Sequence, residues 1–405
     1  MKKIQSTAKR IIMLVLLIMF ILPMIHQTTT HAAEKITHNF YEIPVTVGEH
    51  SDWPLSGILT MPKTASTDRP VPAVILVHGS GPSDLNGNAP LFHPDIRPFY
   101  DLANFLSAHD IAVLRYDNRN FAHGVHMAAN YGATFTVIQE TVAPALYAAE
   151  LLRNDPRISY VYLLGLSLGG MVAPRIHAIG GDFDGIILMA ASSRDPREIS
   201  MTQNLLAFEI AEEQIKLQTA QMLMLAEMGD VDLLQTLLGL PPETTQDEII
   251  VFIHMIYENA MTELTQIPKQ LETTQKLFDS ISYMSTAKAQ SVLVDPNIGM
   301  YAYYWLDIIN HSFELYIDAV DVPMLIMQGL NDFTILADID FARLQNRLYE
   351  RENVRFRLYH GLNHLFMPSS ATNIQESFQE YAFPAQMSVH VLRDIADWIH
   401  MNTVS

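Results

Sequence analysis

The chain has 405 residues, of which 49% are hydrophobic and 17% are charged, so it can bury a large core and is not an intrinsically disordered chain. Its 44 acidic and 25 basic residues give a formal net charge of −19, and this excess of negative charge repels nucleic-acid phosphates and anionic lipid headgroups. The sequence contains no cysteine, which excludes disulfides, thiolate metal sites and a cysteine nucleophile. We therefore expect a folded protein with no nucleic-acid partner.

Residues 1–33 have the pattern of a signal peptide. Four basic residues and no acid precede an unbroken apolar run over 11–22, which Pro23 ends, and small residues follow at 32–33. The run is shorter than the roughly 20 residues that a membrane-spanning helix needs, so a retained anchor is the alternative interpretation. We expect an exported protein that meets the membrane only if this leader is kept.

The next part of the chain alternates between strand and helix patterns, as a parallel sheet requires. Two apolar stretches around a polar turn at 48–52 predict a hairpin within residues 36–61. The expected order after it is strand 73–77, helix 99–108, strand 111–116, helix 137–154 with a kink or late start at Pro144, strand 161–165, helix 169–179 and strand 185–189. Continuously apolar strands indicate a sheet that is covered on both faces.

The alternation stops over residues 193–318, where amphipathic helices are expected and no strand pattern is clear. The four expected helices are 205–228, 233–240, 247–261 and 267–283. The sheet pattern then resumes with strand 323–328, helix 338–347, strand 354–360 and helix 387–400. We therefore predict an α/β fold, a mostly parallel doubly wound sheet in two parts, 34–192 and 319–405, with an all-helical cap inserted between them at 193–318.

Ser167 is the first candidate for a chemical role. It is the middle residue of a Gly-Leu-Ser-Leu-Gly pentapeptide, 165–169, that joins a predicted buried strand to a predicted helix. A serine on such a sharp turn presents its hydroxyl above the sheet edge, and the flanking glycines leave room for the neighbouring strand and helix. The next amide, that of Leu168, would start the helix and could donate to a developing oxyanion.

A nucleophilic serine needs a base and a group that orients the base. Asp332 and His364 follow the last two predicted strands, in the order Ser, Asp, His that this arrangement requires. His360 competes for the role of base, but it ends its strand. Asp338 and Asp340 compete for the role of acid, but we expect them in the first turn of the next helix, where the helix dipole favours acids.

The loop after strand 73–77 supplies a further element. It reads His78-Gly79-Ser80-Gly81-Pro82, and its glycines permit a close approach to the nucleophile. We expect the backbone amide of Ser80 to be the second oxyanion donor.

These motifs together resemble the α/β-hydrolase superfamily, and most closely its bacterial esterases and serine-aminopeptidase-like members with a helical cap. The resemblance covers about residues 36–400, and it is carried by His78–Pro82, Arg115–Asp117, Gly165–Gly170, Asp332 and His364. It implies ester or amide hydrolysis through an acyl-enzyme, with no metal or organic cofactor. Relatives commonly have Asp-x-Arg-Gly where this chain has Asn120 in place of the glycine. Asparagine tolerates a left-handed backbone, so the departure concerns the local turn.

Four weaker patterns are interpreted as ordinary structure. Asp84, Asn86, Asn88 and Asp95 have a calcium-loop-like spacing but lack the glycine that such a loop needs. We expect three histidines to be polar loop residues: His93, His123 and His126. We expect the methionines of the insertion to pack between helices: Met222, Met224, Met228, Met255 and Met261. We expect three glutamates to lie on a solvated helix face: Glu209, Glu212 and Glu213.

The sequence thus predicts an exported carboxylesterase with Ser167 as nucleophile, His364 as base and Asp332 as its orienting acid. The expected partner is a small ester or a short peptide. A serine aminopeptidase or amidase is the alternative within the class, and a non-catalytic binding protein on the same fold is the alternative outside it.

Overall fold

The computed structural model describes residues 39–295 and 300–403, and its framework is an eight-stranded sheet. The predicted leader, residues 1–33, lies outside these residues. Within the part of the chain that is described, no helix is both long enough and apolar enough to span a bilayer.

The sheet is mostly parallel, with the strand order β1-β2-β4-β3-β5-β6-β9-β10. The first two strands form the predicted antiparallel hairpin, and β2 is also antiparallel to β4, whereas the six strands from β4 to β10 are parallel. The strands are β1 (Phe40–Val47), β2 (Leu55–Pro62), β3 (Val71–Val77), β4 (Ala112–Tyr116), β5 (Ile158–Leu166), β6 (Gly185–Met189), β9 (Met324–Gly329) and β10 (Val354–Tyr359).

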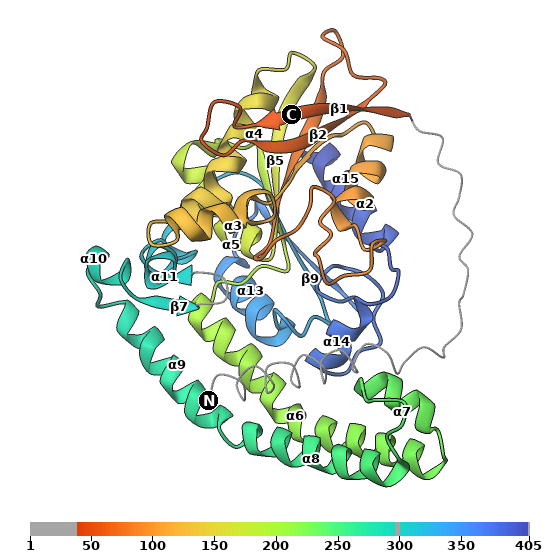
Figure 1. Cartoon of the computed structure of the whole chain (residues 1–405). Coiled ribbons are helices and arrows are strands. Elements are labelled where there is room, and N and C mark those ends of the chain that lie inside the picture. Colours follow the sequence, from red (N-terminus) through yellow and green to blue (C-terminus); the bar gives the residue numbers. More distant parts are fainter. Residues whose placement is uncertain (1–38, 296–299, 404–405) are drawn as a thin grey trace. The chain divides into compact units, whose positions relative to one another are not determined.

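Helices cover both faces of the sheet, as the apolar strands predict (Figure 1). One layer contains α2 (Pro98–Ala108) and α15 (Val389–Thr403). The other contains α4 (Ala143–Arg153), α5 (Leu168–Ile176) and α13 (Ala342–Leu348). Successive residues of the central strands alternate between the two cores: Val74 and Leu76 of β3 face α2 and α15, whereas Ile75 and Val77 face α4 and α5.

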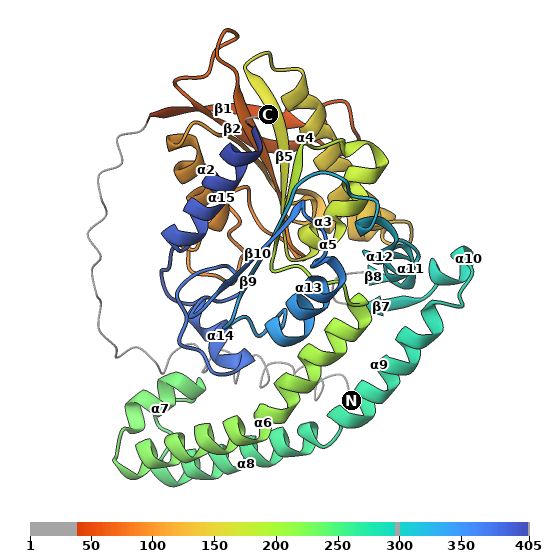
Figure 2. The ribbon, with the colours of Figure 1, turned by 180° about the vertical axis from the view of Figure 1, so that it is seen from behind.

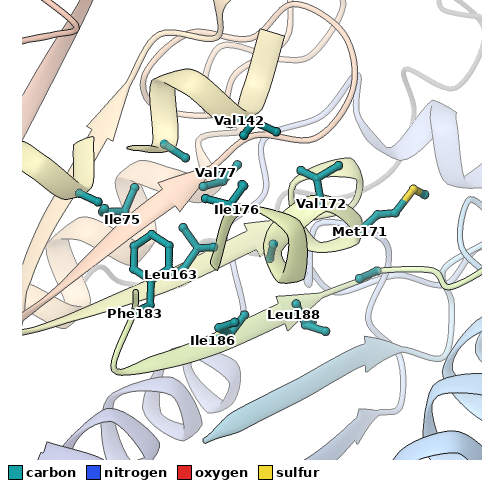
Figure 3. Close-up of a cluster of buried hydrophobic side chains, with 14 of the residues drawn as sticks. Ile75, Val77, Val142, Leu163, Met171, Val172, Ile176, Phe183, Ile186 and Leu188 are labelled. Carbon is teal, nitrogen blue, oxygen red and sulfur yellow. The ribbon is translucent and has the colours of Figure 1, made fainter. Parts of the chain in front are cut away.

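The core on the α5 side joins that helix to three central strands (Figure 3). Met171, Val172 and Ile176 of α5 pack with side chains of β3, β5 and β6, and all of them are at most 8% exposed. Burial of this apolar surface fixes α5 on the sheet, which in turn fixes the residue that precedes the helix.

The described chain divides into two compact units. The smaller, Ser200–Leu277, is the long helical insert and has its own apolar core, formed by Met222, Ala226, Leu234, Leu238, Ile249, Ile253 and Ile256. Its helices are α6 (Pro196–Glu227), α7 (Val231–Leu238), α8 (Gln246–Leu264) and α9 (Ile267–Ile281), which match the four predicted ones, and Figure 2 shows α6 and α8 running side by side. Thr245 and Glu248 form a capping box that begins α8.

The larger unit contains elements that the sequence analysis missed. Residues 278–318, which we had placed in the insertion, group with the sheet, and they include a small antiparallel pair of strands where no strand was expected. The missed elements are α3 (Arg119–Tyr131), β7 (Leu293–Asp295), β8 (Met300–Tyr301), α10 (Thr286–Ala289), α11 (Ala302–Asn310), α12 (Glu314–Ile317) and α14 (Ile374–Glu380). Three π-helical turns adjoin the helices: η1 (Ile138–Val142), η2 (His177–Gly181) and η3 (Ala337–Phe341). Pro144 lies in the opening turn of α4, which follows η1 directly, so a wider π-helical turn and not a break in the helix precedes the proline.

Candidate active site

Four loops that carry the predicted residues meet at one edge of the sheet. Ser80 follows β3, Ser167 follows β5, Asp332 follows β9 and His364 follows β10. These strands are parallel, so their carboxyl ends lie at the same edge. Residues that are up to about 280 positions apart in the sequence are therefore brought to one rim of the molecule.

Ser167 has a strained backbone, with φ of 54° and ψ of −117°. The glycines around it are required by space: a Cβ on Gly165 would lie 2.4 Å from the carbonyl group of Gly169, and one on Gly169 would lie 2.4 Å from the carbonyl oxygen of Val77. The Ser167 amide donates to the carbonyl oxygen of Met189 at 2.8 Å, which ties the turn to β6. The turn is thus held by the sheet and presents the serine between β5 and α5.

The two segments that carry the predicted oxyanion donors adjoin this turn, and the roles of their amides stay predictions. Leu168 is the first residue of α5, so its amide belongs to the positive end of the helix, and the Ser167 side chain does not cap that end. A Cβ built on Gly79 would lie 3.1 Å from Cβ of Ser167 and 3.7 Å from its Oγ. The loop that contains Ser80 therefore passes directly beside the serine, as the glycine pattern predicts.

Asp332 and His364 form a hydrogen-bonded pair. Nδ1 of His364 lies 2.8 Å from Oδ2 of Asp332, which is 2% exposed. The same oxygen accepts from Nε2 of Gln328 at 2.8 Å, and Oδ1 accepts from the amides of Thr334 and Ile335 at 2.8 and 2.9 Å. Because a carboxylate can only accept hydrogen bonds, Nδ1 of His364 is the donor of this one, and in the neutral imidazole Nε2 is then the nitrogen that can accept a proton.

The structure joins the acid to the base but does not hydrogen-bond the base to the serine. Within residues 39–295 and 300–403, Oγ of Ser167 makes no hydrogen bond to His364. Serine and histidine share the sheet edge, and their direct interaction stays a prediction.

The competing residues are placed elsewhere. His360 is exposed at the end of β10. Asp338 is also exposed, and Asp340 is fully buried in η3, where it binds Nε and Nη2 of Arg194 at 2.8 and 2.9 Å. Neither acid contacts His364, so Asp332 is the carboxylate that this histidine meets.

His78 supports the loop beside Ser167, a role that sequence reasoning missed. Its Nε2 lies 2.5 Å from the carbonyl oxygen of Tyr116, and its Nδ1 lies 2.8 Å from Oγ of Ser83. Burial lowers the pKa of His78 to about 4, so the ring is neutral at physiological pH. In that state Nε2 donates to the carbonyl and Nδ1 accepts from the serine hydroxyl, which fixes both ends of the loop.

Asn120 also differs from expectation. Because relatives have a glycine at this position, a left-handed backbone was expected for Asn120. Asn120 instead lies in the first turn of α3 and does not have a positive φ. Its Nδ2 donates to the carboxylate of buried Glu140, which also accepts from the hydroxyl of Tyr304. Burial raises the pKa of Glu140 to about 7, against the effect of these two hydrogen bonds. No local pattern in the sequence pointed to this cluster.

The residues of two weaker patterns take part in local hydrogen bonds. The carboxylate of Asp84 accepts from the amides of Asn86 and Asn88, so this loop is closed by local hydrogen bonds. Among the described residues no group of three or more His, Asp or Glu side chains is arranged to hold a metal ion. His93, His123 and His126 bond within or between loops and helix α3, as expected of polar residues.

The glutamates and methionines of the helical insert agree only in part with the expectation. Glu212 pairs with Lys216 at 2.5 Å on an exposed face of α6. Met222 belongs to the helical core, as expected, but Met224, Met228 and Met255 are 61%, 67% and 45% exposed, so helix packing does not account for them.

Comparison with known proteins agrees with this architecture. Residues 74–371 match the model of the Alpha/beta hydrolase family. The chain is 26% identical to Esterase EstD of Thermotoga maritima over 373 residues, which are 90% of this chain and 72% of the relative. Among solved structures it is similar to Est1E from Butyrivibrio proteoclasticus (14% identity, 89% of this chain and 99% of that one, TM-score 0.49) and to a proline iminopeptidase of Mycobacterium smegmatis (14% identity, 90% and 99%, TM-score 0.43). The family match spans well over half of the chain and coincides with the sheet and its edge loops, and the protein is therefore a member of the alpha/beta hydrolase family.

Proposed function

We propose that this protein is a serine esterase that cleaves carboxylic esters through an acyl-enzyme. The observation that carries the proposal is the 2.8 Å hydrogen bond between His364 and Asp332 at the sheet edge where the strained turn of Ser167 lies. The similarity to an esterase over 90% of the chain favours an ester as substrate.

In the proposed reaction Oγ of Ser167 attacks the acyl carbon while Nε2 of His364 accepts the hydroxyl proton. The carbonyl oxygen becomes an oxyanion, which the amides of Leu168 and Ser80 stabilise. Collapse of this intermediate breaks the ester bond, and the imidazolium returns its proton to the departing alkoxide. Water, deprotonated by the same histidine, then attacks the acyl-enzyme, which releases the acid and restores the serine.

Asp332 acts on the reaction through His364. Its four donors hold the carboxylate in one orientation, so the imidazole keeps the tautomer with Nδ1 protonated and Nε2 free to accept. The carboxylate also stabilises the imidazolium that forms during each half-reaction.

The test uses Ser167→Ala with Ser56→Ala as a matched control, because Ser56 is an exposed residue of β2. We expect the first change to lower kcat by on the order of 10³-fold or more and the second to leave it unchanged. The substrates are p-nitrophenyl esters of increasing acyl length and aminoacyl p-nitroanilides, and a fluorophosphonate reports covalent labelling. Retention of more than about a tenth of the activity by folded Ser167→Ala would refute the nucleophile. Cleavage of the anilides but not of the esters would show that the activity is that of an aminopeptidase and not of an esterase.

We also propose that the protein is exported, on the pattern of residues 1–33. N-terminal sequencing of the protein from cell fractions tests this. A start near residue 34 in the extracytoplasmic fraction is expected, whereas an intact leader in the membrane fraction would make the segment an anchor.

A further inference from the structure

A cavity of about 350 Å³ lies in the larger unit beside the helix that follows Ser167. Its wall is formed by α5, by residues 193–196 after β6, and by residues 308–314 around the turn between α11 and α12. None of the three residues of the proposed triad lines it. The volume falls at the lower end of the range of small-molecule sites, about 300–1,000 Å³.

The lining of the cavity combines apolar side chains with guanidinium groups. The apolar lining comes from Val137, Met171, Val172, Ile308, Ile309 and Phe313. Arg175, Arg194 and Arg343 supply the cationic part. Such a wall suits a ligand with an apolar body and one polar end.

Arg175 has hydrogen-bond donors without an acceptor. Its side chain is 5% exposed, and its two Nη atoms donate to the carboxylate of Asp307, each at 3.1 Å. A guanidinium carries five N–H groups, so three remain, and no acceptor for them exists among the described residues. Because Arg175 lines the cavity, an acceptor bound there can reach these N–H groups.

The other charges of the lining do not satisfy these donors. Asp195 is held by its own neighbour Arg197 through three hydrogen bonds, and Glu314 is 59% exposed and lies 4.0 Å from Arg347. Arg343, which is 52% exposed, lies 3.5 Å from Glu198. Each arginine of the wall likewise has a carboxylate partner outside it, Asp307 for Arg175, Asp340 for Arg194 and Glu198 for Arg343, so what remains for a ligand is the set of Arg175 N–H groups that Asp307 does not use.

We propose that this cavity is a second binding site, for a small amphiphilic carboxylate. The carboxylate oxygens accept from the remaining N–H groups of Arg175, and the apolar body packs against Met171, Val172 and Ile308. An ammonium ligand would meet the guanidinium of Arg175 with a like charge and further donors, and an alcohol would lack the negative charge that strengthens hydrogen bonds from a guanidinium. The site is independent of the proposed esterase reaction.

The test measures binding of octanoate, octan-1-ol and octylamine to the full chain by isothermal titration calorimetry. We expect octanoate to bind about tenfold more tightly than either of the others, because only its head group pairs with a guanidinium. Equal binding of the three, preference for the amine, or no octanoate binding at millimolar concentration would refute the proposal.

Two pairs of variants locate the ligand. Arg175→Lys keeps a cation opposite Asp307 but removes the planar donors, and Arg115→Lys is its control, because Arg115 is equally buried and pairs with Glu42 away from the cavity. Ser312→Trp fills the cavity, and Ser56→Trp places the same side chain on an exposed strand position. Each cavity variant should weaken octanoate binding about tenfold or more while its control leaves the affinity unchanged.

A fifth variant, Arg343→Gln, changes an exposed position of the cavity wall and should weaken octanoate binding about twofold to fivefold. Unchanged affinity in folded Ser312→Trp and Arg343→Gln would place the ligand elsewhere and overturn the assignment.

Discussion

Tyr304 donates a hydrogen bond to the carboxylate of Glu140, a residue 164 positions earlier in the chain. Both side chains are buried, and Asn120 donates to the other oxygen of the same carboxylate. This one acid therefore connects α11, η1 and the start of α3, the helix that follows β4 at the edge of the sheet where the proposed active site lies.

The first prediction concerns the stability of the fold against pH. Burial raises the pKa of Glu140 to about 7, whereas a glutamate in the unfolded chain titrates near 4.5. The unfolded chain therefore loses this proton first as the pH rises, so the stability associated with Glu140 is fully present below about pH 4.5 and declines up to about pH 7. Glu140→Gln removes this titration. The free energy of unfolding of the variant minus that of the wild type should therefore be larger at pH 8 than at pH 5, by on the order of 3 kcal/mol.

Urea unfolding at the two pH values measures this difference. Glu150→Gln is the control, because Glu150 is exposed on the neighbouring helix α4. A pH dependence in Glu140→Gln that equals that of the wild type would show that the carboxyl is already ionised in the fold.

Asp332→Asn should inactivate the protein without unfolding it. The asparagine carbonyl can still accept from the amides of Thr334 and Ile335, but its NH₂ then faces Nε2 of Gln328 and Nδ1 of His364, which are donors in the native state. The histidine must turn or change tautomer to avoid this conflict, and kcat should fall by about 10³- to 10⁴-fold with a smaller effect on KM. Ester hydrolysis by Asp338→Asn, a change at an exposed acid of η3, should be normal. Equal activity of the two variants would remove Asp332 from the mechanism.

His78 is expected to act as a positioning residue for the loop beside Ser167. His78→Phe keeps a ring against Phe99 but leaves the carbonyl of Tyr116 and the hydroxyl of Ser83 without partners. Two unmet polar groups should lower the free energy of unfolding by about 2–4 kcal/mol, and Ser83→Ala, which removes only one of the bonds, should lower it less.

The kinetic readout separates positioning from stability alone. If the loop amide of Ser80 serves the oxyanion, His78→Phe should lower kcat for esters more than it raises KM, because that contact strengthens in the transition state. His126→Phe, on an exposed face of α3, is the control. A native kcat in a destabilised His78→Phe protein would separate the loop from catalysis.

Local patterns predict the sheet and the edge loops well, because each depends on a contiguous signal. The strand at residues 185–189 coincides with β6, and the turn at Ser167 has the glycine spacing that its geometry requires. Helix α3 was missed because its segment contains Gly124, two histidines and few large apolar residues, so the segment as a whole is too polar to stand out as a buried helix. Strands β7 and β8 have three and two residues, too short for any periodicity to show.

The remaining features are pairings between distant segments, which no local pattern can reveal. Glu140 resembles any helix-start acid until Tyr304 and Asn120 enclose it. Arg175 resembles an ordinary basic residue in the last turn of a helix until the fold pairs it with Asp307 and makes it part of a cavity wall. These contacts depend on the path of residues 278–318, which group with the sheet and not with the helical unit.

The last prediction concerns the helical unit, Ser200–Leu277, which the structure allows to be removed as a whole. The unit has its own apolar core, so its excision leaves the two cores of the sheet intact. The chain on either side of it is already joined, because Nη1 of Arg197 donates to the carbonyl oxygen of Phe278 at 2.8 Å and to Oγ of Ser282 at 2.7 Å. A short Gly/Ser linker should therefore close the gap without strain.

We expect the shortened protein to fold and to react with a small fluorophosphonate at Ser167, but to show a changed preference among p-nitrophenyl esters of different acyl length. The reason is that the unit exposes large apolar side chains, among them Leu217 at 54%, Met224 at 61% and Val251 at 68%, which suit contact with an apolar substrate. Ser167→Ala in the same shortened chain is the control for labelling. If the shortened protein folds and labels but keeps the chain-length profile of the full chain, the helical unit does not select the substrate, and its exposed apolar side chains must serve a partner or stability.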